Sequence, residues 1–158
     1  MKKTFFLMVF LSLVWVLISG CGPQKQLPEK LEIPLVPSKG YTGGAKGMAV
    51  INTKTGTDIS ITISGLDPKG LYTAFFINVK SQMFAGIDKK PHVLNVSENG
   101  DVNLQTTMEK NIYKQYIRVG IFSNPGDKAI QNPLGVKATL GALIKEAKPT
   151  LILEGKLR

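Results

Sequence analysis

The feature that most constrains the fold of this chain is a strict alternation of apolar and polar side chains in residues 58–64. Ile59, Ile61 and Ile63 occupy every second position, and hydroxyl-bearing side chains stand between and after them. Because successive side chains of a strand point to opposite faces, this pattern predicts a β-strand with one buried face.

Further segments have the same period or a β-rich composition. No stretch combines caps with a 3.6-residue apolar period, so residues 108–116 are expected to hold no more than one or two helical turns. Asn99-Gly100 is the strongest hairpin signal in the chain. The pattern predicts an all-β fold, a single Greek-key antiparallel β-sandwich. The expected strands are residues 45–53, 58–64, 71–79, 92–96, 102–107, 116–123, 139–144 and 151–157.

The N-terminus has the composition of an export signal. Lys2 and Lys3 precede a wholly uncharged, mainly apolar run over residues 4–18, which is shorter than the roughly 20 residues that span a bilayer. The run ends in Ile18-Ser19-Gly20-Cys21, which resembles the bacterial lipobox. This resemblance implies cleavage between Gly20 and Cys21 and lipidation of Cys21, the only cysteine in the chain.

The lipobox implies a localisation. An acylated Cys21 would make membrane lipid a partner of the chain and hold the domain outside the cytoplasm, because multiple acyl chains give stable anchoring. Gly22 rather than Asp follows the cysteine, which by resemblance permits the outer membrane of a two-membrane cell as well as the cell membrane of a single-membrane one. An ordinary signal peptide and an uncleaved anchor helix are the alternatives.

We expect a Pro- and Gly-rich tether between the lipid and the domain. Pro23, Pro28, Pro34 and Pro37 remove backbone donors and break helix. The predicted division is a signal peptide at 1–20, a lipidated cysteine and tether at 21–45, and a β-sandwich domain at 46–158. Apolar side chains in residues 31–36 leave open that part of the tether packs on the domain as an edge strand.

The order of features in residues 45–144 resembles the copper/zinc superoxide dismutase sandwich and its chordin-type relatives. The resemblance depends on the segments 47–51, 59–66 and 70–71, followed by 96–102 and 116–127. It implies the architecture of that family, so the sandwich is expected to be superoxide dismutase-like or immunoglobulin-like. Tyr72, Phe75 and Ile77 stand where the dismutases place histidines, and the chain has a single histidine, so the family's copper and zinc sites are not expected.

The formal net charge of +9 suggests an anionic partner or a lysine-rich soluble face. Lys2 and Lys3 account for two of the 20 basic side chains, which leaves 18 basic and 11 acidic in residues 21–158. The bases are scattered and form no cluster with aromatics, so nucleic acid is not an expected partner. The expected partner is a cell-envelope protein or an anionic polymer. The loop with Lys89 and Lys90 is the first place to look for the binding site of this partner.

The sequence contains no constellation that predicts catalysis. There is no Gly-x-Ser-x-Gly elbow and no phosphate-binding loop, and the acids are dispersed. We therefore expect no enzyme and no cofactor, but a binding or structural lipoprotein. The alternative is a copper carrier in which Met83, Met108 and His92, with Met48, form a soft Cu(I) site, although such methionines usually fill a core and His92 stands at a loop edge.

Overall fold

The computed structural model describes residues 28–80, 83–89, 92–125 and 149–158. The predicted signal peptide, Gly20, Cys21 and Lys90 lie outside the described residues, as do the strand expected at 139–144 and the side chain of Met83. The predictions for these residues stay predictions.

The described residues form eight antiparallel strands and no α-helix, which confirms the all-β fold class. The strands follow one another in a single sheet in the order β5-β4-β7-β8-β1-β2-β3-β6. Their bounds are β1 Lys30–Pro37, β2 Lys46–Asn52, β3 Asp58–Ser64, β4 Tyr72–Asn78, β5 Met83–Gly86, β6 Val102–Thr107, β7 Arg118–Ser123 and β8 Thr150–Lys156.

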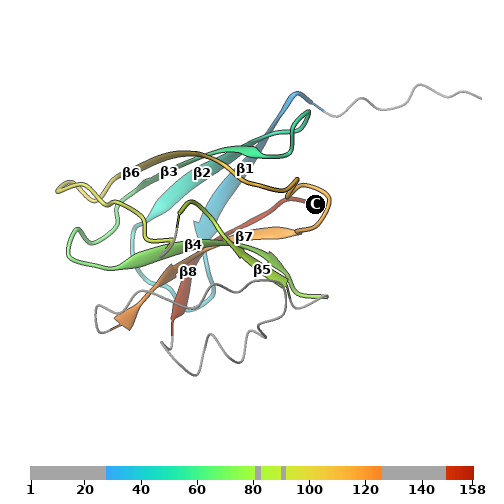
Figure 1. The fold of residues 1–158 in the computed structure, drawn as a ribbon. Coiled ribbons are helices and arrows are strands. Elements are labelled where there is room, and N and C mark those ends of the chain that lie inside the picture. Colours follow the sequence, from blue (N-terminus) through green and yellow to red (C-terminus); the bar gives the residue numbers. More distant parts are fainter. Residues whose placement is uncertain (1–27, 81–82, 90–91, 126–148) are drawn as a thin grey trace, which may run out of the picture.

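The sheet curls so that its two halves face each other across the core (Figure 1). Strand β1 joins the halves, because it pairs with β2 over Lys30–Leu35 and then with β8 at Val36 and Pro37. One half consists of β1, β2, β3 and β6, and the other of β8, β7, β4 and β5. Both halves contribute side chains to the core, among them Ile61 of β3 and Phe76 of β4, neither of which is exposed to solvent.

The division of the chain at residue 46 is wrong, because β1 lies inside the predicted tether. Ile33 and Leu35 are buried and point into the core, whereas Pro34 between them is exposed. The prolines suggested an irregular segment, yet Pro34 lies where β1 pairs with β2 alone, so a missing N–H is tolerated there. Nor is β1 an edge strand, since it has a neighbour on both sides of the sheet. The folded domain therefore begins no later than Lys30.

In the chain segment that runs from β4 to β6, the observed strand pairing also differs from the prediction. Residues 83–86, expected to be loop, pair with β4 as β5. Residues 92–96, expected to be a strand, form only a bridge between Val93 and Thr73. The turn at Asn99-Gly100 does form, with a Gly100 φ of +80°. The strand that follows it pairs with β3 rather than with residues 92–96.

Candidate functional site

The outer face of the half-sheet β1-β2-β3-β6 is polar. Alternate side chains of these strands fill the core, so the remaining ones must face away from it. The register aligns Glu32, Val50, Ser60 and Gln105 in a row across the four strands. All four are at least partly exposed, so this row forms a surface that a ligand can reach.

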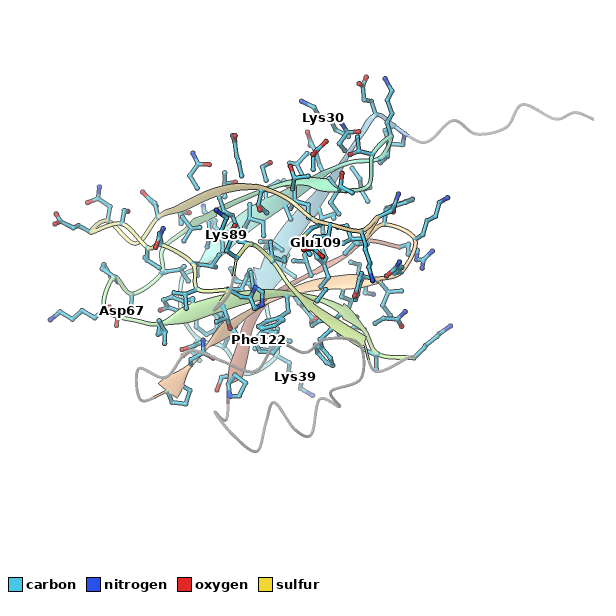
Figure 2. All side chains as sticks on the ribbon, in the orientation of Figure 1. Lys30, Lys39, Asp67, Lys89, Glu109 and Phe122 are labelled. Atoms are coloured by element: carbon cyan, nitrogen blue, oxygen red, sulfur yellow. The ribbon has the colours of Figure 1, made fainter. Side chains whose placement is uncertain are left out.

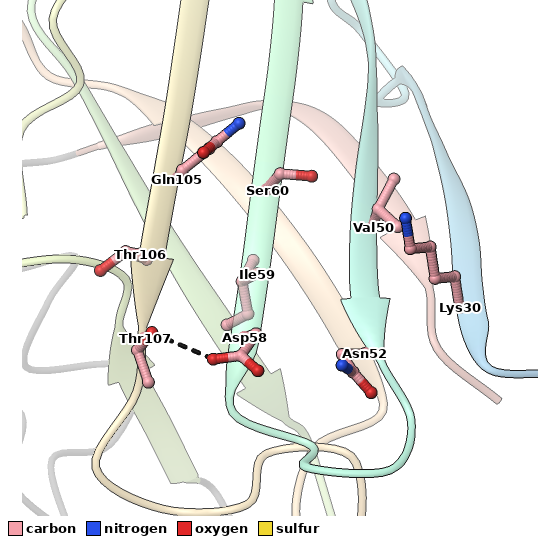
Figure 3. Close-up of a pocket in the computed structure, with 9 residues that line it drawn as sticks. All are labelled: Lys30, Val50, Asn52, Asp58, Ile59, Ser60, Gln105, Thr106 and Thr107. Atoms are coloured by element: carbon pink, nitrogen blue, oxygen red, sulfur yellow. Dashed lines mark hydrogen bonds between the residues drawn. The ribbon is translucent and has the colours of Figure 1, made fainter.

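A shallow open depression of about 430 Å³ lies on this face near the start of β1 (Figure 3). Its polar lining combines one ammonium group, one carboxylate, hydroxyls and amides from four strands. Figure 3 shows Lys30 on β1, and Asp58 beside Thr107 of the neighbouring strand. The lining residues are Lys30, Val50, Asn52, Asp58, Ile59, Ser60, Gln105, Thr106 and Thr107.

The carboxylate of Asp58 is held by two threonine hydroxyls. Thr107 Oγ1 donates to Oδ1 at 3.0 Å, and Thr55 Oγ1 donates to Oδ2 at 3.0 Å. Thr55 Oγ1 also accepts from the backbone N–H of Asp58 at 3.4 Å, which ties the carboxylate to the turn before β3. Each carboxylate oxygen accepts one of these bonds and retains capacity for another, so the group is oriented but still able to bind.

The charges in the depression have no counter-ion in the part of the chain that the structure describes. The ion pairs there join Lys54 to Glu29 and Arg118 to Glu154. Asp58 and Lys30 belong to neither. A carboxylate and an ammonium surrounded by hydroxyl and amide groups suit a polar ligand that offers both donors and acceptors.

The single histidine lies elsewhere, on the outer face of the other half of the sheet. Its ring packs edge-on against Phe75 at a centroid distance of 5.7 Å, above Gly86, where a Cβ would collide with the ring. His92 Nδ1 lies 2.8 Å from the carbonyl oxygen of Asp88, which fixes the loop between them. His92 thus packs against β4 and closes a turn.

The loop before His92 has a strained backbone. The backbone φ angle is 69° at Asp88 and 63° at His92. Residues other than glycine rarely adopt such positive values. Thr106 Oγ1 donates to Asp88 Oδ1 at 3.2 Å, which links the loop to β6. Lys89 is exposed on this loop, where Figure 2 labels it.

The described contacts do not bring the copper-site candidates together. His92 contacts Phe75, which belongs to a small apolar cluster separate from the core. Met108 packs against the main core, and Met48 lies on the outer face of β2. Among the residues that the structure describes, no three His, Cys, Asp or Glu side chains are grouped as metal ligands either.

Comparison with known proteins adds no family. No protein-family model matches the chain, and no curated protein or solved structure matches it. The resemblance to superoxide dismutase-like sandwiches stays a prediction. Within the described residues, no helix has the length and apolar character needed to cross a membrane.

Sequence reasoning missed the residues of the depression. The strand pattern predicts that Ser60 lies on the polar face of residues 58–64, but in the sequence Asp58 is only one of several dispersed acids. No sequence motif marks Gln105 or Thr107 as part of a site. They lie beside Ser60 and Asp58 only because two strands far apart in the chain pair with each other. The alternation itself indicated which side chains face outward.

Proposed function

We propose that this chain is an exported, lipid-anchored protein that binds a polar ligand of the cell envelope in the depression of the β1-β2-β3-β6 face. The observation that supports binding is Asp58, a carboxylate oriented by two hydroxyls and without a counter-ion among the described residues. The proposed anchor is Cys21 in its lipobox-like sequence.

The composition of the depression indicates the chemistry of the ligand. Asp58 accepts hydrogen bonds and favours a hydroxyl or a cationic amine, whereas Lys30 favours an acidic or carbonyl oxygen. The hydroxyl of Ser60 and the amide of Gln105 suit both donors and acceptors. Fragments of cell-wall glycan that carry an amine-bearing peptide combine these groups.

The early start of β1 keeps the depression close to the proposed anchor. Lys30 both begins β1 and lines the depression. Even a fully extended chain from Cys21 to Lys30 spans at most about 30 Å, at 3.3–3.6 Å per residue. If Cys21 is lipidated, the ligand must therefore be found close to the membrane surface.

Metabolic labelling with an alkyne fatty acid tests the anchor. The wild-type chain is expected to incorporate the label and to sediment with membranes. Cys21→Ala is expected to lose the label, because the chain has no other thiol. Equal labelling of both chains would refute lipidation at Cys21.

Titration of the full-length protein in detergent, followed by amide NMR, tests the binding site. The probes are a soluble disaccharide-peptide fragment of cell wall and, in a separate arm, a glycerol phosphate oligomer. The first is expected to shift the amides of Ser60 and Gln105 in the wild type and not in Asp58→Asn. The matched control is Asp67→Asn, which changes an exposed acid outside the depression.

Other outcomes separate the alternatives. Shifts that occur only with the phosphate oligomer, and that Lys89→Ala abolishes, would move the binding site to the basic loop. If neither probe shifts Ser60 or Gln105, the depression is not a site for this chemistry. Neither result bears on lipidation, so the two parts of the proposal fail separately.

A further inference from the structure

One end of the sheet gathers segments that lie far apart in the sequence. Strands β1, β3 and β7 begin there, and β2, β4, β6 and β8 end there, as their antiparallel pairings require. Residues 108–117 connect the two halves of the sheet at this end. The backbone N–H of Ile112 donates to the carbonyl oxygen of Gly56 at 2.8 Å, and that of Ile117 donates to Ile77 at 3.0 Å. Figure 1 shows the start of β1, the β2–β3 turn and the C-terminal residue on this side of the fold.

Among the described residues, basic side chains outnumber acidic ones at this end, which we call the basic end. Its seven basic residues are all exposed and are Lys30, Lys54, Lys80, Lys110, Lys114, Lys156 and Arg158. Its three acidic residues are Glu29, Asp58 and Glu109. The opposite end is balanced, with three described bases and three described acids. These are Lys39, Lys46, Lys69, Asp67, Glu98 and Asp101.

The chain also enters the domain at the basic end. The backbone N–H of Thr53 donates to the carbonyl oxygen of Glu29 at 2.9 Å, and Lys54 Nζ lies 3.0 Å from Oε1 of Glu29. These contacts hold Glu29 beside the β2–β3 turn. Cys21 precedes Glu29 by only eight residues. Even a fully extended connection therefore keeps the basic end within about 30 Å of the proposed lipid.

An exposed apolar side chain lies next to one of these bases. Val79 follows β4 and is 56% exposed, and Lys80 beside it is exposed as well. The other large apolar side chain that is exposed among the described residues is Val36, near the opposite end of β1. A base beside an apolar side chain suits the surface of a bilayer, where charged headgroups cover acyl chains.

We propose that the basic end docks on the anionic phospholipid headgroups of the membrane that carries the chain. This inference rests on the proposed membrane anchoring, and not on the ligand of the depression. Each lysine or arginine close to an anionic bilayer strengthens the attraction about five-fold. This attraction acts only within about 10 Å of the surface at 0.1 M salt. The short connection to Cys21 keeps the bases of this end within reach of the headgroups.

Lysine acylation of the full-length protein in vesicles tests the docking. The protein is reconstituted either into equimolar phosphatidylglycerol and phosphatidylcholine or into phosphatidylcholine alone. It is then treated briefly with a membrane-permeable acylating reagent, and each lysine is followed by mass spectrometry. In the anionic vesicles Lys80 and Lys114 are expected to react about five-fold more slowly than in the neutral ones, whereas Lys39 and Lys69 react equally in both. Molar salt is expected to remove the difference, because it screens the headgroup charge.

Two triple variants separate the charge of this end from the charge of the whole chain. Both lose three exposed lysines and retain Lys80 as the reporter. The first variant carries Lys110→Gln, Lys114→Gln and Lys156→Gln. The matched control carries Lys39→Gln, Lys46→Gln and Lys69→Gln. The first is expected to weaken docking about 100-fold, so that Lys80 reacts equally in both kinds of vesicle, whereas the control keeps Lys80 protected.

The remaining outcomes would overturn the proposal. These are equal reactivity of Lys80 in anionic and neutral vesicles for the wild type, and equal loss of its protection in both triple variants. Protection of Lys80 by a glycerol phosphate oligomer in neutral vesicles, with none from the anionic lipid, would assign the basic end to an anionic polymer instead. Sedimentation of the wild type with neutral vesicles reports the anchor alone, so a failure of anchoring is distinguished from a failure of docking.

Discussion

Replacement of Ile33 by alanine tests whether β1 is an integral strand. Its side chain is 1% exposed and lies in the main core. Ile33 pairs with Ala49 of β2, and its Cγ2 occupies space that a Cβ on Gly155 of β8 would enter, at 2.6 Å. The side chain thus packs between the two halves of the sheet, where β1 alone joins them.

The magnitude follows from this burial. Isoleucine-to-alanine changes in a core cost about 2–5 kcal/mol, depending on how far the surroundings collapse into the cavity. Ile33 contacts strands of both halves, so neither half alone can fill the space, and we expect about 4 kcal/mol. With a urea dependence of about 2 kcal/mol per molar, the unfolding midpoint would fall by about 2 M. This loss is a large part of a typical domain stability of about 5–15 kcal/mol.

Equilibrium urea unfolding of residues 22–158 measures the effect. Circular dichroism is the suitable signal, because the single tryptophan, Trp15, is not in this fragment. The control is Val36→Ala in the same strand, where the side chain is 52% exposed and a change below about 0.5 kcal/mol is expected. If Ile33→Ala were as mild as Val36→Ala, residues 30–37 would be a tether after all.

Three further predictions use the same fragment and urea unfolding. Gly155→Ala should cost about 1–3 kcal/mol, because its Cβ would overlap Ile33 at 2.6 Å; an unchanged midpoint would show that β1 and β8 are not so closely packed. Burial raises the pKa of Tyr116 above 10.0, so its stabilising contribution is complete below pH 10 and is lost as pH rises through its folded pKa; Tyr116→Phe should therefore lose less stability above about pH 10 than wild type, and equal slopes would contradict this. Asn124→Ala should cost about 1–3 kcal/mol, since the buried Thr73 Oγ1 loses the amide donor at 3.2 Å; a loss below about 0.5 kcal/mol would mean that water replaces the amide.

The sequence alone determined much of the local structure. The alternation in residues 58–64 predicted β3 with its observed bounds, and residues 102–107 did the same for β6. The Asn99-Gly100 turn also forms, because Gly100 supplies the positive φ that the turn requires. These features depend on side-chain periodicity and on backbone preference within a few residues, which a sequence displays directly.

Only the tertiary structure decided which strands are neighbours. Alternation shows which side chains of a strand face inward, but every strand offers the same backbone groups to any partner. Strand β6 therefore pairs with β3 and not with residues 92–96, as the sequence had suggested. The proline-containing segment of β1 is the strand that joins the two halves of the sheet. The depression with Asp58 depends on the same pairings, since Lys30, Asp58 and Gln105 meet only once β1, β2, β3 and β6 lie side by side. Contacts between residues so far apart are selected by how completely the whole core is buried, a property of the assembled sheet and not of any one segment.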